Sequence, residues 1–183
     1  MKVLNLVFLS MLLLTSCNPD RNKSIDPDTP VFHTTDASEL FFKNVRKTYY
    51  DLEDQHEHKM LIYRFSKRVQ TDDKPILNLN LVINWMKDEA YVLFEHNHFF
   101  EIDGEKHITW YDTEGIKMGE LSYKPTNIRS QFNMATTLYM CIKQGHTFKL
   151  QIGDATYDLL STKAEREAFR ITMYDFYRLV ELL

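Results

Sequence analysis

In four segments between residues 60 and 123 apolar side chains recur at every second position, and this period limits the folds that the chain can adopt. Successive side chains of a β-strand point to opposite faces, so a period of two is typical of strands with one buried and one solvated face. The segments with this pattern are 60–67, 77–85, 106–112 and 116–123. Residues 90–95 are apolar on both faces, which predicts a central strand. We therefore expect an antiparallel meander over this part of the chain.

Glycines mark the turns and one irregularity of this meander. Asp103-Gly104 suits a type I′ hairpin turn, and Gly115 ends the polar stretch before the last of these strands. Gly119 interrupts the alternation within residues 116–123. A glycine inside a strand indicates a β-bulge or a close approach by another group.

Later segments have helical spacing. Residues 127–143 place apolar side chains every three or four positions, and Gly145 stands where a C-terminal cap is expected. A hairpin is expected next, with strands at 147–152 and 156–159. Thr162 and Glu165 then form a capping box before a second helical stripe, which covers residues 168–183. Neither helix lies in a βαβ alternation, so the expected fold class is α+β: an antiparallel meander sheet of about six to eight strands packed by two amphipathic helices, the last one C-terminal.

The stretch before residue 60 fits two interpretations. Phe41, Val45 and Tyr49 lie at helical spacing, whereas residues 44–52 also contain several good strand formers. We expect a short helical turn at 38–43, a strand over 44–52 and a polar turn at 53–59.

Residues 1–16 have the organisation of a secretory signal peptide. Lys2 precedes an apolar run over residues 3–14, and the small residues Thr15 and Ser16 follow it. At ~1.5 Å per residue this run extends about 18 Å, which is well short of a hydrocarbon core of ~30 Å. We therefore expect a targeting segment that does not span the membrane.

The tetrapeptide Leu14-Thr15-Ser16-Cys17 resembles the lipobox of bacterial lipoproteins. The resemblance implies cleavage before Cys17 and a lipid on its sulfur, so that the protein is held on the membrane through Cys17. In enterobacterial lipoproteins an aspartate after this cysteine retains the protein in the inner membrane. Asn18 occupies that position here, which favours the outer membrane, with the domain facing the periplasm or the cell surface.

The remainder divides into a tether and one domain. Residues 17–35 contain three prolines, several aspartates and few apolar side chains, a composition that does not repay the entropy of ordering. We expect these residues to form the lipidated cysteine and a disordered tether, and residues 36–183 to form a single globular domain, which is long enough to bury a core.

Charge and cysteine content exclude several functions. The net charge of −4 is not that of a protein that binds nucleic acid, so we expect no such partner. With Cys17 lipidated, Cys141 has no partner for an intramolecular disulfide. On an apolar helix face, Cys141 is expected to be a small core residue.

Two groups of polar residues are candidates for a site. The first is a pair of His-x-His motifs, in which two imidazoles on one strand face could share a metal ion. Its residues are His56, His58, His96 and His98, with Glu95, Asp103 and His107 nearby. The alternative interpretation is that these are polar residues collected at turns.

The second group is Asn78, Asn80 and Asn84, which lie on one face of a strand. Asparagine is depleted in strands, so this row could bind a polar ligand or glycan. The alternatives, which the sequence favours, are the solvated outer face of a one-sided sheet and hydrogen bonding to the neighbouring segment.

Motifs of common enzyme classes are absent from the sequence, namely Gly-x-Ser-x-Gly, His-Glu-x-x-His, a phosphate-binding glycine loop and Cys-x-x-Cys. We expect no cofactor. The sequence favours a lipid-anchored cell-envelope protein with a non-catalytic binding or accessory domain that has an envelope protein or a ligand as its partner. The alternative is a metal-dependent hydrolase of the envelope that uses the histidines around His96 and His98.

Overall fold

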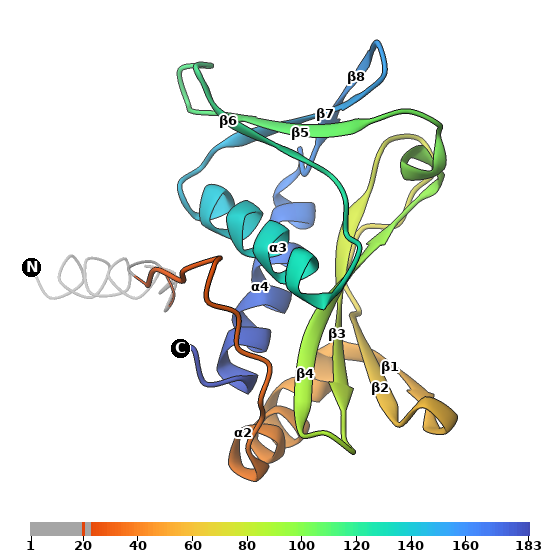
Figure 1. Ribbon diagram of the computed structural model, residues 1–183, viewed down its shortest axis with the longest axis vertical. Helices are drawn as coiled ribbons and strands as arrows, with labels where there is room; N and C mark the ends of the chain where they lie inside the picture. Colours follow the sequence, from red (N-terminus) through yellow and green to blue (C-terminus); the bar gives the residue numbers. More distant parts are fainter. Residues whose placement is uncertain (1–19, 21–22) are drawn as a thin grey trace, which may run out of the picture.

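The computed structural model describes residue 20 and residues 23–183. The expected signal peptide, the lipobox and Cys17 lie outside the described residues. The described chain is α+β, as expected, with eight antiparallel strands in two four-stranded sheets (Figure 1).

The first sheet has the order β1-β2-β3-β4. Its strands are β1 (Tyr50–Gln55), β2 (Met60–Phe65), β3 (Leu77–Asn84) and β4 (Glu89–His96). In its register Tyr63 lies opposite Leu81, and Leu81 lies opposite Val92. The alternation in β2 and β3 correctly predicts the core face, because Tyr63, Phe65, Leu79, Leu81 and Ile83 all belong to the main hydrophobic core.

The second sheet has the order β6-β5-β7-β8. Its strands are β5 (Lys106–Tyr111), β6 (Lys117–Ser122), β7 (Thr147–Ile152) and β8 (Ala155–Leu159). The expectation of one continuous meander is therefore corrected to two sheets. Strand β5 pairs with β6 on one side and β7 on the other, so no edge is left for β4. The short 3₁₀-helix η5 (His98–Glu101) lies where the chain passes from one sheet to the other.

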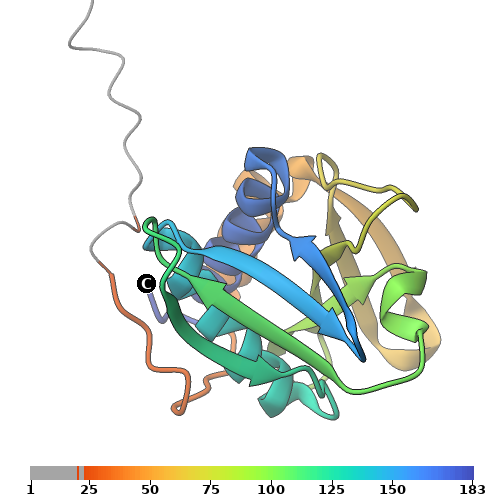
Figure 2. The same cartoon turned by 90° about the horizontal axis from the view of Figure 1, so that it is seen from above.

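Two capped helices form the layer between the sheets. α3 (Ile128–Lys143) begins with a capping box between Asn127 and Ser130, and α4 (Lys163–Leu179) with one between Thr162 and Glu165. α4 packs mainly on β3 and α3 on β4, while the second sheet lies across the top of both helices in Figure 1. Figure 2 shows the same layers from above.

Residues 36–49 are helical, so of the strand expected over 44–52 only residues 50–52 are strand. These belong to β1, which extends to Gln55 and so into the turn expected at 53–59. The segment runs through α2 (Asp36–Phe41), the π-helix η2 (Phe42–Arg46) and the 3₁₀-helix η3 (Lys47–Tyr49) before β1 begins. Contacts with α4 explain why this segment is helical. Phe42 is buried, and Arg46 donates a hydrogen bond of 2.8 Å to the buried carboxylate of Asp175. Tertiary packing therefore overrides the strand propensity of residues 44–49.

Residues 23–35 form an ordered strap along the domain, which differs from the disordered tether that their composition predicts. Ile25 is buried, and the ring of Phe32 meets that of Phe132 edge-on at 5.9 Å. The carbonyl of Phe32 accepts a hydrogen bond of 2.7 Å from the amide of Ala90, and His33 forms a β-bridge with Glu89. The strap therefore covers the start of the free edge of β4, and a few anchor residues order a segment of polar composition.

Two local expectations are confirmed. A Cβ atom at Gly119 would lie 2.4 Å from Cζ2 of Trp110, and the ladder changes register between Trp110 and Tyr111. Cys141 is buried, and this burial raises the pKa of its thiol to about 11. Cys141 is thus a core residue, and its thiol is protonated at neutral pH.

Candidate functional site

The first sheet has two different faces. Its inner face carries α3 and α4, whereas on its outer face no helix of the described chain is packed (Figure 1). Ile62 and Val82 are both buried, yet neither belongs to the main hydrophobic core. They are cross-strand neighbours on the outer face, and Tyr91 follows in the same row.

An apolar patch occupies the centre of this outer face. Half-buried side chains on β2 and β4 surround Ile62 and Val82. The hydroxyl of Tyr91 on β4 lies 3.0 Å from the sulfur of Met60 on β2, and this contact joins the two strands across β3. We call this set, which consists of Met60, Ile62, Val82, Tyr91 and Leu93, the outer-face patch.

Two arginines and three carboxylates border the patch. Arg64 contacts Glu53 at 2.5 Å and Glu95 at 3.4 Å. Arg68 contacts Glu95 at 3.2 Å and Asp51 at 2.9 Å. Hydrogen bonds from Arg68 and Ser66 hold the pKa of Asp51 below its usual value. Glu95 is thus shared by both guanidinium groups, and the five side chains form one connected rim.

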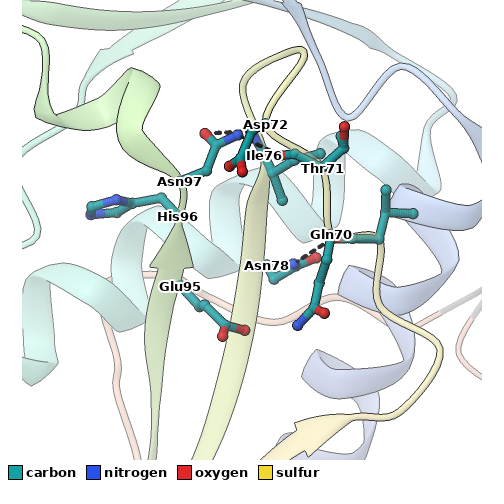
Figure 3. A pocket seen from close by; sticks show the side chains of 9 residues that line it. Gln70, Thr71, Asp72, Ile76, Asn78, Glu95, His96 and Asn97 are labelled. Carbon is teal, nitrogen blue, oxygen red and sulfur yellow. Dashed lines mark hydrogen bonds between the residues drawn. The ribbon is translucent and has the colours of Figure 1, made fainter.

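A cavity of about 130 Å³ lies beyond this rim, between residues 66–76 and the ends of β3 and β4 (Figure 3). The side chains of its two asparagines form hydrogen bonds with the backbone of that loop. The side-chain amide of Asn78 donates to the carbonyl of Val69 at 2.9 Å. The amide of Asn97 donates to the carbonyls of Thr71 and Lys74 at 2.8 and 2.7 Å, and its oxygen accepts from the amide of Ile76. These contacts clamp the loop and engage the side-chain amides of both asparagines that line the cavity.

The three asparagines of the predicted row therefore have three different environments. Asn78 bonds to a neighbouring segment, which was one of the two alternatives to ligand binding. The oxygen of Asn84 accepts from the amide of Met86 at 3.2 Å within the β3–β4 turn. Asn80 is buried opposite Arg64, and its oxygen has no hydrogen-bond partner among the described residues. They do not form a continuous binding row.

The histidines are also dispersed. His96 ends β4 and stacks on Phe100 with a centroid distance of 5.1 Å, while His98 lies in η5 and contacts the ring of Phe99. The two rings therefore do not share a strand face, which the metal interpretation requires. His56 and His58 lie together in a separate 3₁₀-helix, η4 (His56–His58). Within residue 20 and residues 23–183, no group of three or more histidine, cysteine or acidic side chains could hold a metal ion.

The sequence pattern missed the outer-face patch for one reason. Residues 90–95 are apolar on both faces, and this pattern predicts a central strand. β4 is instead the edge strand, so its second apolar face points outward beside β3. Part of its free edge is bonded by the side chain of Gln131, whose oxygen accepts from the amide of Phe94 at 2.8 Å. An edge strand with two apolar faces is the signal that could have located this surface.

Comparison with protein-family models, with curated proteins and with solved structures returned no match. Among the described residues, no helix combines the length and the apolar character that crossing a membrane requires.

Proposed function

We propose that this protein is a lipid-anchored protein of the bacterial cell envelope, attached through Cys17, with a non-catalytic binding or accessory domain. In this proposal the outer-face patch is the surface that binds another envelope protein. The main support for this proposal is that the patch lies on a sheet face against which no helix of the described chain packs, and that a charged rim borders it.

An apolar centre inside a polar rim is the usual anatomy of a protein–protein interface. Tyr91 and Leu93 supply apolar side chains that remain half-buried. Arg64 and Glu95 supply the rim, where charges set partner choice and association rate more than affinity. Apolar patches rimmed by polar residues mark interaction sites when they are large and exposed. In this patch Ile62 and Val82 are buried, so a partner would contact chiefly the half-buried Met60, Tyr91 and Leu93.

A hydrolase has less support. The described histidines belong to separate structural elements, and the asparagines near them hold a loop in place. Metal analysis of the untagged soluble domain distinguishes the two functions. Stoichiometric zinc or another transition metal, with a loss of thermal stability on chelation, would favour the hydrolase and contradict the proposal.

Site-specific crosslinking of the full-length protein in its own membrane tests the binding surface. A photoreactive amino acid at Leu93 lies on the outer-face patch, whereas the same group at Lys149 lies on the exposed face of the second sheet. We expect a discrete crosslinked partner from position 93 and none from position 149. Repeated recovery of the protein alone from both positions would contradict the proposal.

A pair of charge substitutions provides the matched control. Leu93→Glu places a carboxylate in the patch, while Met118→Glu places one at an exposed apolar position of β6, where the native side chain is 54% exposed. We expect only Leu93→Glu to abolish recovery of the partner. Loss of the partner with both variants, or with neither, would contradict this choice of surface.

A further inference from the structure

Asp20 is fixed to the domain by three strong contacts. Its side chain is only 1% exposed, and the hydroxyl of Tyr139 on α3 donates to Oδ2 at 2.6 Å. Nη1 of Arg170 on α4 donates to both carboxylate oxygens at 3.0 Å. A buried carboxylate with this many charge-assisted partners holds its segment firmly against both helices.

The strap continues this attachment along α3. The ammonium group of Lys143 hydrogen-bonds the carbonyl of Lys23, and Ile25 is buried beyond it. Nearer the start of α3, the guanidinium of Arg129 donates to the carbonyl of Asp28 at 3.3 Å. From Lys23 to Asp28 the strap therefore runs antiparallel to α3, and Asp20 is attached to the same helix through Tyr139.

Chain length then limits the distance between Asp20 and the lipid. Two residues, Asn18 and Pro19, lie between Cys17 and Asp20, so three Cα-to-Cα steps join them. Whatever conformation they adopt, a chain extends at most ~3.3–3.6 Å per residue, so the two Cα atoms lie within about 11 Å of each other. A flexible tether from residue 17 to residue 35 would instead allow a separation several times larger.

We propose that Asp20 is a fixed mooring point that holds one side of the domain against the phospholipid surface. The inference depends on the lipid anchor of the proposed function and adds an orientation to it. The side held there contains Gln144, which is exposed just after α3, and half-buried side chains of α4 such as Arg170. The start of the strap and the C-terminus lie on this side in both views (Figures 1 and 2).

The surface beside Asp20 has the chemistry of a membrane interface. Arg170 also lines a groove of about 250 Å³ between α4 and residues 41–46, together with Tyr174 and Arg178. The guanidinium of Arg178 lies 4.1 Å from the ring centroid of Phe41. Val45 in the same groove is 47% exposed. Aromatic and arginine side chains are enriched where a protein meets the headgroup region, because each combines an apolar body with a polar end.

The same geometry turns the outer-face patch away from the membrane. The first sheet lies on the opposite side of α3 and α4 from the start of the strap in both views (Figures 1 and 2). A partner protein would therefore reach the patch without competing with lipid.

Distances between labelled sites and the bilayer test the mooring. The full-length lipidated protein is placed in vesicles of phosphatidylethanolamine and phosphatidylglycerol that contain an acceptor dye. A donor is attached in turn to Gln144→Cys, Val45→Cys or Leu93→Cys, in a Cys141→Ala background. A domain of this length has a radius of gyration of roughly 15 Å, so labels on opposite sides differ in height by roughly 30 Å.

We expect strong energy transfer from positions 144 and 45 and weak transfer from position 93. A flexible Gly-Ser insertion between Cys17 and Asp20 should reduce the transfer from position 144 towards that from position 93. Equal transfer from the three positions, or transfer from position 144 that is unchanged by the insertion, would overturn the inference.

The mass of the N-terminal peptide, measured on the same sample, separates the two proposals. If Cys17 is acylated and the three labelled positions give equal energy transfer, only the mooring is refuted. An unmodified N-terminus would refute both the mooring and the lipid-anchored function.

Discussion

Asp20 and Arg170 lie 150 residues apart in the sequence, and their side chains meet through two hydrogen bonds of 3.0 Å. Tyr139 completes the contact from a second helix. One carboxylate near the proposed lipid anchor is thus held by both α3 and α4.

Removing the Asp20 carboxylate should destabilise the domain. Asp20→Ala leaves Arg170, which is 13% exposed, with Glu167 as its remaining ion-pair partner among the described residues. Breaking a buried pair costs about 3–5 kcal/mol, and the remaining partner should reduce this to roughly 2–3 kcal/mol. Denaturant unfolding of a chain that begins at Asn18 measures the change. Asp28→Ala, at an exposed position of the same strap, is the control and should change stability by less than about 0.5 kcal/mol. Equal effects of the two substitutions would contradict a special role for Asp20.

The Asp20 contribution should disappear in acid. Burial of the carboxyl acts to raise its pKa, but the hydrogen bond from Tyr139 and the charge and hydrogen bonds of Arg170 outweigh burial, so the pKa lies below its usual 3.8. A lowered pKa in the folded state stabilises the protein above pH 3.8, and this contribution is lost as the pH falls through the folded-state pKa. The difference in unfolding free energy between wild type and Asp20→Ala should therefore be constant near neutral pH and shrink below pH 3.8. A difference that grows in acid would contradict this assignment.

The two asparagines Asn97 and Asn80 should respond oppositely to substitution. Asn97→Ala removes three hydrogen bonds that hold residues 66–76 and should cost about 1–3 kcal/mol. Asn80→Leu replaces a buried amide whose oxygen is unpaired among the described residues, so it should be neutral or stabilising by up to ~1 kcal/mol. Hydrogen exchange of residues 66–76 should accelerate only in Asn97→Ala. Unchanged exchange in that variant would show that the asparagine does not clamp the loop.

Gly119 should tolerate no side chain while Trp110 is present. An added Cβ would lie 2.4 Å from Cζ2 and 2.8 Å from Cε2 of the indole ring. Overpacking of this kind costs about 1–3 kcal/mol, and displacement of the ring should shift tryptophan fluorescence. Trp110→Leu provides the second arm of a double-mutant cycle, and Gly119→Ala should cost much less in that background. Additive effects would mean that the two residues are not coupled.

Local patterns predicted most elements of the fold. The period of two located β2, β3 and β5, and the capping box at Thr162 located the start of α4, because these signals depend on neighbouring residues. The division into two sheets was not predicted, since pairing of β5 with β7 is decided by a distant strand. The helical state of residues 44–49 also depends on distant contacts, such as that between Arg46 and Asp175.

The candidate site was less predictable than the fold. Alternation placed Asn78 and Asn80 on the correct face, but a spacing does not reveal that one amide bonds to Val69 and that the other is unpaired among the described residues. The strap was missed because composition predicted disorder, whereas Ile25 and Phe32 find packing sites that the rest of the domain supplies. Burial of Asp20 required two partners from separate helices, and no local pattern encodes such a meeting.

The mass of the N-terminal peptide of the membrane-extracted protein tests the central claim most directly, because both proposals require a lipid on Cys17. We predict a peptide that begins at Cys17 and carries diacylglycerol on its sulfur, and a Cys17→Ser variant that stays as an uncleaved precursor with altered fractionation. An unmodified peptide, or membrane association and mass that Cys17→Ser leaves unchanged, would contradict the account.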